Sequence, residues 1–232
     1  MNYSLPPRIC RTLLVLSLFG TLSACTLTSP NANTQFEQVA QSIVDYRKRV
    51  NPYTQPKGVD GYLLPNLSAE FLKQQYEEKT ALLSRLDAID SDQLSSENSI
   101  NLSIIRAQVQ NSVDEYVFNA HYMPLTSEYG FHSSLSYMIN SSQYKQPQQL
   151  ETYLARLEQV PRFFEQNIHW MKKGLETGLT QPQAVLAGYE DSISAYIVDD
   201  VTQSDFYSPF KTNTAGLSEN DFKALQQKAK RI

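Results

Sequence analysis

Three histidines are the side chains of this sequence best suited to bind a transition metal or to move a proton near neutral pH. None of His121, His132 and His169 lies at the spacing of roughly three to five residues that is typical of zinc ligands. His169 falls on a predicted amphipathic helix, where a partly buried or surface position is more common than a ligand role. His121 and His132 could approach each other in space, but two imidazoles without a third ligand make a poor metal site. We therefore predict no metal site in this chain.

Motifs for nucleophilic or phosphate chemistry are also missing. The sequence contains no G-x-S-x-G and no S-x-x-K with its partner motifs. Its eight glycines do not form a phosphate-binding loop. We therefore predict no catalytic residue and no cofactor for these 232 residues.

Aromatic side chains crowd the irregular segment 121–146, which Pro124 and Gly130 interrupt. Rigid rings on a loop can line a groove for a peptide or a sugar, and they can equally fill the core between helices. If the segment forms a substrate groove, Tyr129 and His132 are its candidate residues. The aromatic residues of the segment are Tyr122, Tyr129, Phe131, Tyr137 and Tyr144.

An acidic cluster lies between two predicted helices. It lacks the mid-loop glycine of a calcium loop, so we expect its side chains to cap helices and stabilise turns. Its members are Asp87, Asp90, Asp92 and Glu97.

The elements that must position these side chains are helices, because apolar residues recur at three- and four-residue spacing through most of the chain. Ser68 and Ser218 are predicted N-caps, Pro147 begins a helix and Gly178 ends one. Predicted helices span 35–50, 68–89, 96–120, 147–161, 161–178, 182–198 and 218–232, with a short one near 134–139. In the helix 161–178, the residues expected to face inward are Phe164, Ile168, Met171 and Leu175.

The pattern contains no strand-like alternation of useful length. We therefore predict an all-α fold, an irregular antiparallel array of roughly six or seven helices. The Pro- and Gly-rich stretch 51–66 is long for a loop, and long loops in compact proteins are often functional.

The N-terminus has the order of an export signal. Arg8 and Arg11 precede the apolar run Leu13–Leu22, which is too short for a permanent membrane helix of about 20 residues. Leu22-Ser23-Ala24-Cys25 then resembles the lipobox of bacterial lipoproteins, in which the chain is cut before a lipid-modified cysteine. We predict cleavage between Ala24 and Cys25 and lipidation of Cys25; an ordinary secretory signal with a chance cysteine is the alternative.

This interpretation divides the chain into a signal peptide 1–24, a lipidated tether 25–33 and a helical domain 34–232. Cys10 leaves with the signal peptide, so the remaining chain has neither a free thiol nor a disulfide. The membrane is the expected partner through the lipid. Thr26, in place of an aspartate that would resemble the inner-membrane retention signal, favours the outer membrane, facing the periplasm.

The net charge excludes one class of partner. The chain carries a formal charge of -4 at pH 7, and an acidic surface repels nucleic acid. We expect no nucleic-acid binding.

Several segments resemble the DUF885 family of bacterial proteins in their order and spacing. They are Ala88-Ile89-Asp90 with Leu94-Ser95, Tyr153-Leu154-Ala155-Arg156-Leu157 through Pro161, Gly174-Leu175-Glu176-Thr177-Gly178 with Pro182, and Ser208-Pro209-Phe210.

The resemblance implies a helical zinc peptidase of clamshell form in longer relatives, with peptide as substrate and the zinc motif in a later part that this sequence lacks. The predicted last helix reaches Ile232 without a stop signal, which leads us to expect a truncated chain. Our first hypothesis is an inactive N-terminal fragment of a metallopeptidase-like envelope lipoprotein. The alternative is a complete, non-catalytic helical lipoprotein that binds peptides or an envelope partner.

Overall fold

A computed structural model describes residues 30–54, 57–126, 128–135 and 144–232. Over these ranges the protein is helical and contains no strand, which confirms the predicted all-α class. Contacts group Asn31–Ile232 into one unit. None of the helices described is long and apolar enough to cross a membrane. The predicted signal peptide and the Ala24–Cys25 cleavage site lie outside the described residues.

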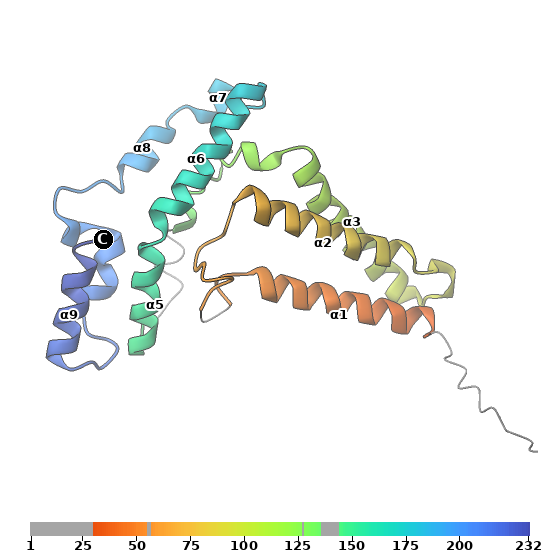
Figure 1. Cartoon of the computed structure of the whole chain (residues 1–232), viewed down its shortest axis with the longest axis horizontal. Coiled ribbons are helices and arrows are strands. Elements are labelled where there is room, and N and C mark those ends of the chain that lie inside the picture. The colour runs from red at the N-terminus through yellow and green to blue at the C-terminus, as the bar shows by residue number, and fades with distance from the viewer. Residues whose placement is uncertain (1–29, 55–56, 127, 136–143) are drawn as a thin grey trace, which may run out of the picture. The chain divides into compact units, whose positions relative to one another are not determined.

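Three long helices share one core cluster (Figure 1). They are α1 (Ala32–Val50), α2 (Ala69–Asp87) and α3 (Ser96–Val117). Asn31, Ser68 and Ser95 each accept a hydrogen bond from a backbone N–H of the following first turn, so all three helices begin at a side-chain cap. The Ser68 cap was predicted. The buried faces meet through Phe36, Val39, Ile43, Leu82, Leu83, Leu86, Leu102, Val109 and Val113.

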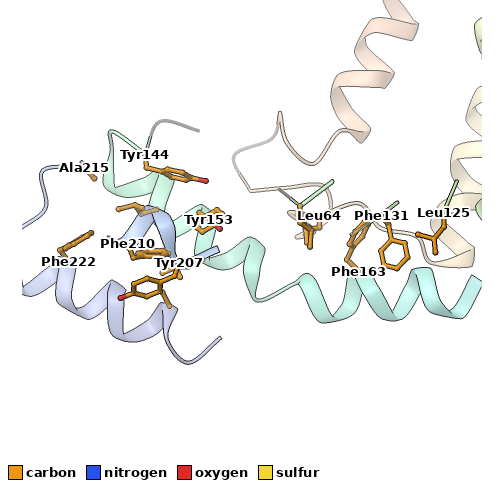
Figure 2. Close-up of a cluster of buried hydrophobic side chains, with 14 residues drawn as sticks. Leu64, Leu125, Phe131, Tyr144, Tyr153, Phe163, Tyr207, Phe210, Ala215 and Phe222 are labelled. Atoms are coloured by element: carbon orange, nitrogen blue, oxygen red, sulfur yellow. The ribbon is translucent and has the colours of Figure 1, made fainter. Parts of the chain in front are cut away.

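A second core cluster joins the C-terminal elements (Figure 2). These include α5 (Pro147–Leu157), the 3-10 helix η4 (Asp205–Phe210) and α9 (Glu219–Ala229). Tyr153 and Phe210 are fully buried, and the Tyr153 hydroxyl donates to the Phe206 carbonyl at 3.0 Å. As predicted, Pro147 opens α5 and Ser218 caps α9 by accepting from the Asp221 N–H.

Helix α6 (Val160–Thr177) binds the extended segment 61–68 through polar side chains. The Gln159 side-chain oxygen accepts from the Leu63 N–H at 2.8 Å, and the Gln166 oxygen accepts from the Leu67 N–H at 2.9 Å. The Trp170 indole N–H donates to the Leu67 carbonyl at 2.7 Å. Backbone N–H and C=O groups of the segment therefore form hydrogen bonds with side chains instead of with a neighbouring strand.

Arg162 makes the most contacts with this segment. Its guanidinium donates to the Leu64 carbonyl at 3.2 Å and to the Pro65 carbonyl at 3.1 Å, and it lies 4.5 Å from the centre of the Tyr62 ring. We call Gln159, Arg162, Gln166 and Trp170 the α6 polar row. Their spacing of three to four residues places them on one face of the helix.

The polar row explains an error in the predicted face of α6. Ile168 and Leu175 were expected to face inward, but 42% and 72% of their surfaces are exposed. The helix instead buries Phe163, Asn167, Trp170 and Gly174. The prediction counted apolar residues only, whereas this helix also packs a polar face against a backbone.

The predicted helix 182–198 is also wrong as a single element. It divides into α7 (Gln183–Leu186) and α8 (Tyr189–Ser194) at Gly188, whose φ of 82° is left-handed. The predicted loop after it contains η3 (Val201–Gln203) and η4. Gly178, with a φ of 77°, ends α6 as predicted. Most of the short helix expected near 134–139 lies outside the described residues.

Candidate functional site

The two candidate groove residues differ in exposure. Tyr129 presents 51% of its surface to solvent, whereas His132 is 5% exposed. The His132 ring packs edge-on against Tyr189, with ring centres 5.5 Å apart. No ring contact joins Tyr129 to His132 in the part of the chain that the structure describes, so the pair does not form one wall there.

His132 contacts a serine in a way that resembles a base beside a nucleophile. Its Nε2 lies 3.0 Å from the Oγ of Ser192 on α8. However, the Ser192 hydroxyl donates its only proton to the Tyr189 carbonyl at 2.7 Å, so Nε2–H must be the donor to Oγ. The buried Nδ1 has no hydrogen-bond partner within the described ranges, so no third group orients the ring. The contact ties α8 to the segment around His132 and does not activate Ser192.

Burial of His132 predicts a pH effect on stability. Burial lowers the pKa of His132 below its ordinary value of 6.5, so the unfolded chain binds a proton more readily than the folded one. The contribution of His132 to the free energy of unfolding is therefore complete above pH 6.5 and decreases as the pH falls below that value. Urea unfolding at about pH 7.5 and about pH 5.5 should show this loss, and His132→Gln should reduce it.

His169 provides the matched control for that experiment, because it is an exposed histidine on α6. Equal pH slopes for His132→Gln and His169→Gln would contradict the prediction.

Five rings line a cleft between α2, the end of α3, the 3-10 helix η2 (Ala120–Tyr122) and α6. Tyr76 stacks on Tyr116 with ring centres 4.6 Å apart, and Tyr116 stacks on His121 at 5.8 Å. His121 meets Trp170 edge-on at 4.5 Å, and Tyr122 stacks on Trp170 at 5.5 Å. We call the cavity of about 270 Å³ beside these rings the aromatic cleft. Burial lowers the pKa of His121, so its ring is neutral near pH 7.

Two backbone features bring these rings together. Asn119, with a φ of 55°, ends α3 in the left-handed region and turns the chain into η2. Gly174 on α6 then allows close approach, since a Cβ there would lie 2.6 Å from the Leu179 carbonyl oxygen and 3.2 Å from that of Tyr122. The position of Gly174 next to Tyr122 is not visible from sequence spacing.

Other predicted positions have simple roles. His169 is exposed, as predicted, and contacts Trp170 with ring centres 5.0 Å apart. Asp90 caps η1 (Ser91–Gln93) by accepting from the Asp92 N–H, which confirms the capping role for this member of the acidic cluster. Asp87 forms an ion pair with Arg106.

The described residues do not provide a ligand set for zinc. Within residues 30–54, 57–126, 128–135 and 144–232, no group of three or more His, Cys, Asp and Glu side chains could hold a metal ion. No step of a metal-dependent reaction is therefore assigned to them.

Comparison with known proteins places this helical region in a family. The chain matches the family described as "Bacterial protein of unknown function (DUF885)" over residues 56–232, a range that includes all five rings of the aromatic cleft. A search of curated proteins gave no significant match, and neither did a search of solved structures. The family match confirms the resemblance drawn from the sequence. Since it covers more than half of the 232 residues, the chain belongs to the DUF885 family.

Proposed function

We propose that this protein is a bacterial envelope lipoprotein, cut before Cys25 and anchored in the outer membrane through lipid on that residue, with its helical domain facing the periplasm. The observation that carries the proposal is Leu22-Ser23-Ala24-Cys25 directly after the apolar run Leu13–Leu22. Five residues separate Cys25 from Asn31, the cap of α1. Fully extended, this stretch spans at most roughly 20 Å, so a lipid on Cys25 would keep the start of α1 near the membrane.

Mass spectrometry of the protein extracted from membranes tests the anchor. We expect an N-terminal peptide that begins at Cys25 and carries a diacylglyceryl group. A chain that begins at Met1, or a peptide with an unmodified Cys25, would contradict the proposal. Recovery in the inner-membrane fraction would contradict the outer-membrane location alone.

The second part of the proposal concerns chemistry. The resemblance supports a role in a metallopeptidase-like protein, with peptide as substrate and with any zinc held outside the described residues. The helical domain would then contribute binding surface for the peptide. The alternative is a complete lipoprotein that binds peptides or an envelope partner without cleaving peptides.

Zinc analysis and peptide hydrolysis test this assignment. We expect the purified protein, without an added subunit, to hold no stoichiometric zinc and to leave peptides intact. One zinc per chain, or hydrolysis that a chelator abolishes, would show that these residues form a metal site after all.

A further inference from the structure

A second cavity adjoins the aromatic cleft. The two cavities share Leu72, Tyr76, Tyr116 and His121 in their walls. The second, of about 290 Å³, is also lined by Gln75, Lys79, Ser112 and Glu115, and we call it the charged cavity. Both volumes fall just below the range of roughly 300–1,000 Å³ for drug-sized ligands. An occupant must therefore be small.

Among the described residues, two opposite charges line the charged cavity without a hydrogen bond or a close ion pair. Lys79 comes from α2 and Glu115 from α3, and neither has an ion pair or a hydrogen bond in the part of the chain covered by the structure. Several other charges on α2 form ion pairs, as Lys73 does with Glu77 and Glu78 does with Arg49. Burial lowers the pKa of Lys79, and the nearby Glu115 carboxylate opposes this shift. A half-buried ammonium that makes no hydrogen bond is costly, and a ligand carboxylate within hydrogen-bond distance would satisfy it.

We propose that the charged cavity and the aromatic cleft together bind a free amino acid as its zwitterion. The ligand carboxylate pairs with Lys79 and its ammonium pairs with Glu115. An apolar side chain then lies against the rings of Tyr76, Tyr116 and His121. A residue within a peptide has neither charge, and a terminal residue has only one of them beside its side chain. A cavity wall that carries both Lys79 and Glu115 therefore favours the free zwitterion.

The aromatic cleft contains its own reporter, because Trp170 is the only tryptophan of the chain and lines the cleft. L-phenylalanine added to the full-length, detergent-solubilised protein should change Trp170 fluorescence in a saturable manner. N-acetyl-L-phenylalanine lacks the ammonium and L-phenylalaninamide lacks the carboxylate. Each should bind about tenfold more weakly than L-phenylalanine.

Variants assign each charge to its partner. Lys79→Met should weaken the binding of L-phenylalanine about tenfold and leave the affinity for L-phenylalaninamide unchanged. Glu115→Gln should likewise weaken the binding of L-phenylalanine about tenfold and leave the affinity for N-acetyl-L-phenylalanine unchanged. Lys73→Met and Glu77→Gln are the matched controls, because they remove an exposed pair on α2 that does not line the cavity. Circular dichroism melts establish that each variant is folded. If a variant does not fold, the affinities of the original protein for the three ligands still test the inference.

Several outcomes would overturn the inference. They are no saturable signal with L-phenylalanine, equal affinity for all three ligands, or the same affinity in Lys79→Met as in Lys73→Met. The inference rests on the fold and not on the lipid anchor. Failure here would therefore leave the mass-spectrometric test of Cys25 unaffected.

Discussion

Replacing Cys25 by serine should produce an uncut, lipid-free precursor. The thiol is the group that takes the diacylglyceryl chain, and a serine hydroxyl is a much weaker nucleophile at neutral pH. Each buried methylene of an acyl chain contributes about 0.8 kcal/mol to membrane binding, so loss of the lipid removes the dominant anchor. The uncut leader retains Leu13–Leu22, which is too short to span the bilayer. We expect alkaline carbonate to extract Cys25→Ser from membranes while the original protein stays bound.

The chain provides a matched control at its other cysteine. Cys10 lies in the predicted signal peptide, so Cys10→Ser should yield the same mature, lipidated protein as the original sequence. Immunoblots resolve the uncut chain from the mature one, and metabolic labelling with a radioactive fatty acid follows the lipid. Normal size and labelling of Cys25→Ser would reject lipidation at this residue.

Replacing Arg162 by alanine should lower the stability of the protein more than replacing any other residue of the α6 polar row except the buried Trp170. The variant leaves the Leu64 and Pro65 carbonyls without their donor and removes the stacking on Tyr62. We expect the free energy of unfolding to decrease by about 2–3 kcal/mol. For a domain of this size that corresponds to a decrease of roughly 5–10 °C in Tm, measured by circular dichroism.

Two comparisons separate this effect from a general loss of charge. Arg162→Lys keeps the charge but cannot reach both carbonyls with one planar fork, so most of the loss should remain. Arg106→Ala removes an exposed arginine whose ion pair with Asp87 is half open to solvent, and it should cost less than about 1 kcal/mol. If Arg162→Ala were as mild as Arg106→Ala, the polar row would not hold the segment 61–68.

The local parts of the fold could be predicted from the sequence. Ser68 and Ser218 cap their helices as expected, because an N-cap depends on a few neighbouring residues. Gly178 adopts the left-handed conformation that ends α6 for the same reason. The break at Gly188 was missed because the apolar register was given more weight than a single glycine.

The contacts that shape the cleft depend on residues far apart in the chain. Tyr76, His121 and Trp170 belong to α2, η2 and α6, and no spacing rule brings them together. The weak sequence signal was the abundance of aromatic residues, and it was assigned to Tyr129 and His132 instead. Gln159 and Gln166 carried no signal either, because periodicity arguments treat a polar residue as solvent-facing.

The division of the core into two clusters has a consequence for the order in which the chain folds. The cluster of α1, α2 and α3 uses only residues up to Val113, so it can close while later residues are still being synthesised. The other cluster includes Ala229 of α9, so it is complete only once α9 has been synthesised. Pulse-labelling hydrogen exchange should therefore find amides of α1 protected before those of α5.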